Sequence, residues 1–134
     1  MRYMLDTDIC IYTINDRPPA VLQAFREHES AGLGISSVTA AELFFGVART
    51  GSERNLDALR RFLSALEIAP FDGGAAEVSG SLRSWLAKQG TPIGPYDTLI
   101  AAHAQALGVT LVTNNLREFE RVPGLQLQNW ALTK

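Results

Sequence analysis

The amino-acid sequence predicts an α/β fold in which a central, mainly parallel sheet is flanked by helices. Two observations lead to this prediction. Short apolar runs of strand length alternate along the chain with longer segments whose apolar residues recur at helical spacing. Glycine, proline and asparagine residues fall between these segments, where short turns are expected. Strands that alternate with helices form parallel sheets whose faces are covered by those helices.

The first half of the chain is expected to begin with a buried strand over residues 2–5, which is apolar and stops at Asp6. A short helix over 9–14 follows, and the run from Asn15 to Pro19 breaks it. Apolar residues at helical spacing predict helices over 20–29 and 36–49, and two glycines bracket a second strand that ends at Ile35.

The second half is expected to contain three helices and three strands. Residues 56–66 have leucines on one face and charged residues on the other, which is typical of an amphipathic helix. Residues 68–71 form a weak strand, 75–89 a helix, and Pro95 suits the first position of a helix over 95–107. Gly108 ends that helix, the β-branched run 109–113 predicts a strand, and a last short strand is expected over 125–128.

Length and charge restrict the class of protein. A chain of 134 residues is expected to form one domain over 1–134. The single cysteine, Cys10, excludes a disulfide framework and a cysteine-rich zinc site. No apolar run approaches the roughly 18 residues that span a bilayer, and Asp6 comes too early for a secretion signal. We therefore expect a soluble, cytoplasmic protein that does not associate with membranes.

Polar side chains follow the predicted strands at the points where the strands end. Asp6 follows the first strand, Asn114 and Asn115 follow the strand over 109–113, and Asp97 lies in the first turn of the helix over 95–107. In open parallel sheets, ligands bind beyond the carboxyl ends of the strands. Glu42 is different because it lies within an apolar helix, where an ionised group is costly unless a partner or a cation compensates it.

Each of these residues also has a purely structural interpretation. Asp6 and Asp8 are able to cap a helix, Thr39 and Glu42 match a capping box, and Asp97 gains from a helix dipole. Together, however, they form a cluster of oxygen ligands, which favours Mg²⁺ or Mn²⁺ over zinc. His28 and His103 are too isolated to form a zinc site. A magnesium site of this kind predicts phosphodiester hydrolysis.

Four segments carry a resemblance to a known family. These segments are residues 3–8, 35–43, 92–102 and 111–119. In their order and spacing the chain resembles PIN-domain ribonucleases, and within them the VapC toxins of bacterial VapBC toxin–antitoxin pairs. The resemblance implies a three-layer fold and makes Asp6, Glu42 and Asp97 metal ligands within an acidic quartet. Many PIN domains have aspartate at the fourth position, where this chain has Asn115. We expect Asn115 to be a neutral oxygen ligand or a water holder and Glu118 to supply the nearby acid.

The resemblance also implies an activity and partners. Asp6, Glu42, Asp97, Asn115 and Glu118 become the expected catalytic set of an endoribonuclease that uses Mg²⁺, or Mn²⁺, to hydrolyse RNA. Frequent targets of the family are tRNAs, which are left with 5′-phosphate and 3′-hydroxyl ends. One firmly held Mg²⁺ and a second recruited with the substrate are expected. The family also implies a homodimer and a VapB-like antitoxin whose tail lies along a hydrophobic groove and reaches the acidic pocket.

Other side chains have less specific expectations. Thr7, Ser37 and Thr113 carry hydroxyls that could contact ligands or phosphate. Helical spacing favours core positions for Phe44 and Phe45, although they could line the antitoxin groove; Cys10 and Trp85 are also expected in the core. The candidate contacts to the RNA backbone are Arg49, Arg54, Arg60, Arg61, Arg83, Arg117 and Arg121.

Two alternatives differ in class from a nuclease. Asn115 keeps open a catalytically silent PIN-like module that binds RNA or protein without cutting it. A phosphoacceptor domain also clusters acids at strand ends but needs a lysine after a late strand, and neither Lys88 nor Lys134 follows one. No phosphate-binding glycine loop that would indicate a nucleotide-binding enzyme is present.

Overall fold

The computed structural model describes residues 1–132, so Lys134 lies outside the described residues. The strands are β1 (Tyr3–Leu5), β2 (Leu33–Ser36), β3 (Glu67–Ala69), β4 (Thr110–Val112) and β5 (Leu127–Gln128). The helices are α1 (Thr7–Ile14), α2 (Pro19–His28), α3 (Ser37–Thr50), α4 (Glu53–Ser64), α5 (Gly73–Gln89), α6 (Pro95–Leu107) and α7 (Leu116–Phe119), with a 3₁₀ turn over Glu29–Ala31. No helix within residues 1–132 has the length and apolarity to cross a membrane.

The strands form one sheet in the order β3-β2-β1-β4-β5, and every pairing is parallel. The register aligns Tyr3 with Leu33 on one side and with Thr110 on the other. The chain therefore builds the sheet outward from β1 to β3 and then continues on the other side of β1 with β4. This reversal between β1 and β4 is a topological switch point, where open parallel sheets bind their ligands.

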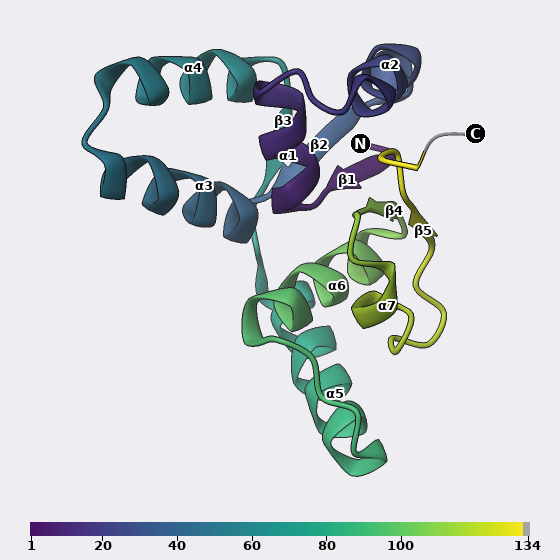
Figure 1. Cartoon of the computed structure of the whole chain (residues 1–134). Helices are drawn as coiled ribbons and strands as arrows, with labels where there is room; N and C mark the ends of the chain where they lie inside the picture. The colour runs from purple at the N-terminus through teal and green to yellow at the C-terminus, as the bar shows by residue number, and fades with distance from the viewer. Residues whose placement is uncertain (133–134) are drawn as a thin grey trace.

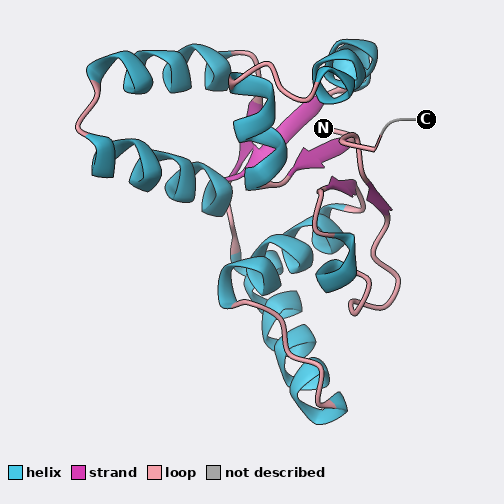
Figure 2. Ribbon diagram, in the orientation of Figure 1, coloured by secondary structure: helices cyan, strands magenta, loops and turns pink. Residues whose placement is uncertain are grey.

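The sheet separates two apolar cores and thereby gives three layers, as the sequence predicted (Figure 1). Successive side chains of β1 point to opposite faces: Tyr3 and Leu5 belong to one core, and Met4 belongs to the other. Helices α1 to α4 contribute to the first core and α5 to α7 to the second. Figure 2 shows the short strands between these two groups of helices.

Local sequence explains where the site-bearing helices begin. Asp6 is the N-cap of α1 and Ser36 is the N-cap of α3, and each side chain accepts a backbone N–H of its own helix. Pro95 occupies the first turn of α6, where its missing N–H costs nothing. Each of these helix starts directly follows a strand or a turn, so the first turns of α1 and α3 lie at the carboxyl edge of the sheet.

The structure corrects several predictions. The sheet is entirely parallel in the described residues, and the four-residue helix α7 was not predicted because it is too short to show helical spacing. Phe44, Phe45 and Trp85 were expected in the core but are 39%, 64% and 42% exposed, whereas Cys10 is fully buried as expected. Helices α3 and α4 extend beyond the sheet as a hairpin (Figure 1), so the outer side of α3 has no layer to cover it.

Candidate active site

Asp6 is the most buried carboxylate of the site. It follows β1, is 6% exposed, and receives hydrogen bonds from the Thr7 N–H (2.9 Å) and the Thr113 hydroxyl (2.7 Å). Burial raises the pKa of Asp6 to about 6, with help from the charges of Asp8 and Glu42, and the two hydrogen bonds oppose this rise. The hydroxyl of Thr113, which follows β4, therefore fixes this carboxylate across the switch point.

Glu42 contacts α1, away from the N-terminus of its own helix. The Thr7 hydroxyl donates to Glu42 Oε1 at 3.0 Å, and the Glu42 side chain is half-buried. The capping-box interpretation is wrong, because α3 begins after Ser36 and Thr39 lies buried inside the helix. The Thr7 backbone N–H thus donates to Asp6, and the Thr7 hydroxyl donates to Glu42. Thr7 therefore connects these two acids.

Asp97 and Glu118 form a hydrogen-bonded carboxyl pair. Burial, the bond to Glu118 and the charges of Asp6, Glu118 and Glu42 raise the pKa of Asp97 to about 8. Burial also raises the pKa of Glu118, but the bonds from Asp97, the Gly94 N–H and Asn115, together with the charge of Arg121, outweigh it and lower that pKa. The metal-free pair therefore holds one proton between its two carboxyl groups.

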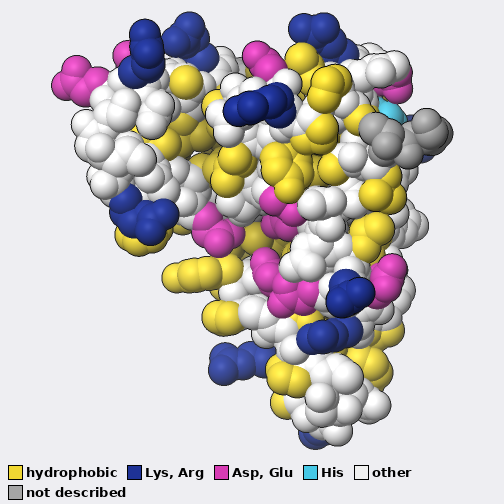
Figure 3. All heavy atoms as spheres, viewed as in Figure 1, with side chains coloured by type: hydrophobic (Ala, Val, Ile, Leu, Met, Phe, Trp, Pro, Cys, Tyr) yellow, Lys and Arg dark blue, Asp and Glu magenta, His cyan; other side chains and the backbone are white. Residues whose placement is uncertain are grey.

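Four carboxylates from four segments of the chain thus interact electrostatically at one edge of the sheet. They follow β1 (Asp6), lie on α3 (Glu42), begin α6 (Asp97) and lie on α7 (Glu118). Figure 3 shows acidic side chains gathered in the middle of the molecule, bordered by hydrophobic and basic side chains. All of their donor atoms are oxygen, which is the ligand type that Mg²⁺ and Mn²⁺ prefer.

The site carboxylates accept hydrogen bonds from neighbouring protein groups and do not converge on one point. Within residues 1–132, no three acidic, histidine or cysteine side chains converge closely enough to bind one ion directly. Asp6 and Glu42 instead accept threonine hydroxyls, and Asp97 shares a proton with Glu118. Mg²⁺ binds proteins through one or two carboxylates and keeps several waters, so this donor set fits such an ion. The raised pKa of Asp97 also fits, since a cation relieves repulsion among close carboxylates.

Asn115 acts as a donor to Glu118. Its side-chain nitrogen lies 2.6 Å from Glu118 Oε2, and its backbone N–H donates to the Thr113 hydroxyl at 3.0 Å. The sequence predicted a neutral oxygen ligand or a water holder at this position. In the structure, the Asn115 amide nitrogen orients Glu118, which lies one helical turn further along the chain, and a role of the amide oxygen toward an ion or a water stays a prediction.

Two contacts at the site were not predicted. The Gly94 N–H donates to Glu118 Oε1 at 2.8 Å, and the missing side chain of Gly94 leaves room for Asp97 and Glu118. Asp8, considered only as a cap, accepts the N–H groups of Ile9 (2.7 Å) and Asn114 (3.1 Å). The Gly94-Pro95 pair at the start of α6 was the available signal, because it marks a tight entry into that helix.

Ser37 and the arginines were also candidates for contacts to ligand or RNA, and they have different partners in the structure. The Ser37 hydroxyl accepts the Phe71 N–H at 3.0 Å, so its role is structural. Arg121 donates to the Pro92 carbonyl at 3.0 Å and adds positive charge beside Glu118. In the described part of the chain the one salt bridge joins the amino terminus to Glu67, so the arginine side chains have no carboxylate partner within 4.0 Å.

Comparison with known proteins bears on this arrangement. The sequence model of the PIN-domain family matches residues 3–125 of the chain. The chain belongs to the PIN-domain family. It is 44% identical to the tRNA(fMet)-specific endonuclease VapC of Salmonella typhimurium, over 98% of this chain and 99% of that protein. It is equally similar to the ribonuclease VapC2 of Haemophilus influenzae strain Rd, with the same coverage, so within the family it belongs with the VapC proteins.

Solved structures agree with this placement. A crystal structure of DNA-bound VapBC from Salmonella typhimurium superposes with a TM-score of 0.90 at 44% identity, covering 97% of this chain and 98% of the chain compared. The three-layer PIN fold expected from the sequence is thereby confirmed.

The VapC-family chain also has a groove of about 280 Å³ between α1, α3 and α4, lined mainly by apolar side chains. Its lining includes Ile11, Ile14, Leu43, Val47 and Leu59.

Proposed function

We propose that this VapC-family protein is the toxin of a VapBC-type pair, a Mg²⁺-dependent endoribonuclease that cleaves RNA, and tRNA in particular. One observation carries the proposal. Asp6, Glu42 and Asp97 reach the switch point of the sheet from three distant segments and influence one another electrostatically. Asp6 is buried and the other two acids are half-buried, which is costly for charged groups, and a cation with a phosphodiester substrate gives them a use.

The acids that would hold the ion are Asp6, Glu42 and Asp97, with Glu118 beside them. PIN nucleases generally depend on a divalent metal. When bound, Mg²⁺ lowers the pKa of water and stabilises the negative charge that develops on the phosphate. Mn²⁺ has similar ligand preferences and is expected to substitute for it.

The remaining polar residues orient these acids. The Thr113 hydroxyl fixes Asp6, and the Thr7 hydroxyl fixes Glu42. Glu118 bonds the protonated Asp97 in the metal-free protein, and a cation at Asp97 would displace that proton. Glu118 is itself held by Asn115 and by the Gly94 N–H. Such fixed donors hold a site in its working geometry before the substrate binds, which is a large part of catalysis.

The proposed substrate is RNA, held through its backbone. Exposed arginines without carboxylate partners are free to bind phosphate oxygens. The net charge of −2 indicates binding that depends on salt and on local arginines rather than on a strongly basic surface. The name of the Salmonella relative, a tRNA(fMet)-specific endonuclease, favours tRNA as the target. We infer that the protein acts in the cytoplasm, where tRNA is found.

The proposed partners are a VapB-like antitoxin and a second copy of the chain. Solved relatives from Salmonella typhimurium and Rickettsia felis are VapBC complexes. The apolar groove between α1, α3 and α4 suits an amphipathic antitoxin segment, and Leu43 in its wall is adjacent to Glu42. Exposed aromatic residues such as Phe45 and Trp85 are consistent with a homodimer contact.

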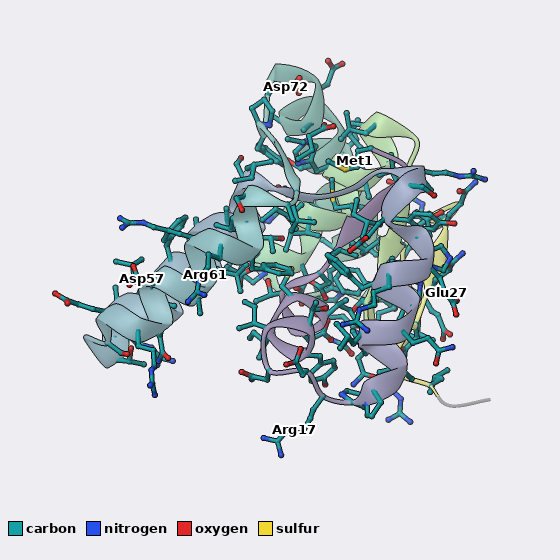
Figure 4. The ribbon with its side chains drawn as sticks, turned by 90° about the horizontal axis from the view of Figure 1, so that it is seen from above. Met1, Arg17, Glu27, Asp57, Arg61 and Asp72 are labelled. Atoms are coloured by element: carbon teal, nitrogen blue, oxygen red, sulfur yellow. The ribbon has the colours of Figure 1, made fainter. Side chains whose placement is uncertain are left out.

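Cleavage assays with matched variants test the proposal. Wild type, Asp6→Ala and Asp97→Asn are incubated with total RNA in Mg²⁺ and in EDTA. The control is Asp57→Ala, because Asp57 is exposed on α4 (Figure 4), a helix that carries none of the site acids. We expect cleavage by wild type and Asp57→Ala in Mg²⁺ only, and none by the site variants. Identical RNA patterns for wild type and Asp6→Ala would instead favour a silent PIN-like binding module.

A further inference from the structure

A buried histidine outside the acid cluster joins two of the helices that carry it. His103 lies on α6, is 1% exposed, and its Nδ1 is 2.8 Å from the hydroxyl oxygen of Ser36. Ser36 is fully buried at the end of β2 and is the N-cap of α3, where it also accepts the Val38 N–H at 3.0 Å. The bond therefore connects the interior of α6 with the first turn of α3.

The two helices joined in this way each carry one of the site acids. Glu42 lies on α3 and Asp97 on α6, each six positions away from the residue that makes the bond. This separation is about 9 Å along each helix axis. A helix is rigid over that length, so a shift of α3 against α6 at the bond moves Glu42 relative to Asp97.

The surroundings of His103 favour a fixed, uncharged ring. Phe71 packs edge-on against it, with ring centroids 5.4 Å apart, and the Phe71 N–H is held by the Ser37 hydroxyl. Burial lowers the pKa of His103, and the nearby charge of Asp72 only partly opposes this. The imidazole of His103 and the hydroxyl of Ser36 are both buried, so removing either one leaves the other without this hydrogen-bond partner, which is costly.

We propose that His103 is a positioning residue: its buried bond to Ser36 fixes α3 against α6 and so holds Glu42 opposite Asp97 for metal binding. This inference rests on the proposed function for its catalytic consequence. It also makes a statement about cation affinity that does not depend on RNA cleavage.

The test compares His103→Phe, His103→Asn, Ser36→Ala and the double variant His103→Phe/Ser36→Ala. Phenylalanine fills the space without the hydrogen bond, whereas asparagine keeps a donor and an acceptor near the Nδ1 position. His28→Phe is the matched control. His28 is the other histidine of the chain, it packs on Tyr3 and Trp130, and it bonds the Ala24 carbonyl within its own helix.

Two assays are run on protein whose fold is checked by circular dichroism. The first measures the Kd for Mn²⁺, obtained from the electron paramagnetic resonance signal of free Mn²⁺. The second measures kcat and KM for cleavage of a tRNA in Mg²⁺. We expect His103→Phe to weaken Mn²⁺ binding and to lower kcat by about ten- to a hundredfold with little change in KM. His103→Asn should recover most of both losses, and His28→Phe should change neither.

The double variant separates positioning from simple loss of stability. If the bond is the cause, His103→Phe and Ser36→Ala together weaken Mn²⁺ binding no more than the worse of the two alone. Mn²⁺ affinity within twofold of wild type in Ser36→Ala overturns the proposal, even where His103→Phe fails to fold. Wild-type protein that does not cleave RNA refutes the proposed function alone, because Mn²⁺ affinity still decides the role of His103.

Discussion

A single methyl group at Gly94 is expected to disturb the acid pair without changing any charge. Gly94 is the N-cap of α6, with φ −53° and ψ 150°, a conformation that alanine adopts without strain. A Cβ atom there would lie 3.3 Å from Asp97 Oδ2 and 3.6 Å from Glu118 Oε1. Gly94→Ala keeps the N–H that donates to Glu118, so the added volume is its main effect at the site.

The size of the effect follows from that contact. At 3.3 Å the carbon and oxygen are closer than ordinary van der Waals contact, so Asp97 has to move by a few tenths of an ångström. A misplacement of 1 Å costs an enzyme about a hundredfold in rate, so we expect kcat to fall by about three- to tenfold. Stability should change by less than about 1 kcal/mol, because alanine fits the backbone but is a weaker N-cap.

The assay measures single-turnover cleavage of a tRNA in Mg²⁺, the Kd for Mn²⁺ and thermal unfolding. Gly80→Ala is the control, because it is the same substitution in the interior of α5 and its Cβ atom meets nothing within 4 Å. We expect it to stabilise the fold by about 0.5 to 1 kcal/mol at an unchanged rate. If Gly94→Ala cleaves and binds Mn²⁺ like wild type, then the close approach of Asp97 to Glu118 does not govern the site.

Three further experiments probe the same acids. Glu42→Gln should abolish cleavage and shift stability by less than about 1 kcal/mol, since glutamine still accepts the Thr7 hydroxyl; a large loss of Tm would point to a structural role. The pKa of Asp97 is raised to about 8 from 3.8, so metal-free folded protein retains a proton that the unfolded chain has lost, and stability falls as pH rises between about 4 and 8. In EDTA, Asp97→Asn should therefore gain Tm relative to wild type at pH 8 but not at pH 4, and equal differences at both pH values would contradict the acid pair. Mg²⁺ at about a hundred times its Kd should stabilise wild type by about 2.7 kcal/mol in thermal unfolding and leave Asp6→Ala unchanged, whereas equal stabilisation of both would place the ion elsewhere.

The positions of three acids could be predicted because they depend on local sequence. Asp6 directly follows an apolar strand, Asp97 lies two residues after the proline that begins a helix, and Glu42 is a charged residue in an apolar helix. Parallel strands present their carboxyl ends at one edge, so these acids were expected to meet. The strand order that brings Thr113 onto Asp6 depends instead on pairings between distant segments, which no local pattern specifies.

The errors at aromatic positions have a common physical cause. Helical spacing identifies which residues share a face of a helix, but it does not say whether another layer covers that face. Phe44 and Phe45 lie on α3 where the α3–α4 hairpin extends beyond the sheet, and Leu43 faces the core instead. Trp85 on α5 is exposed for the same reason, while Leu82 and Leu86 of that helix are buried.

The fourth acid could not be assigned from sequence because its position depends on a single helical turn. Asn115 occupies the expected place after β4, yet α7 begins there and carries Glu118 one turn further on. Residues three apart on a helix lie on the same face, so the Asn115 amide reaches Glu118 Oε2 at 2.6 Å. In this arrangement a negative charge lies at Glu118, and Asn115 orients it. An aspartate in place of Asn115 would put two like charges at that contact, so the amide and the displaced acid are parts of one arrangement.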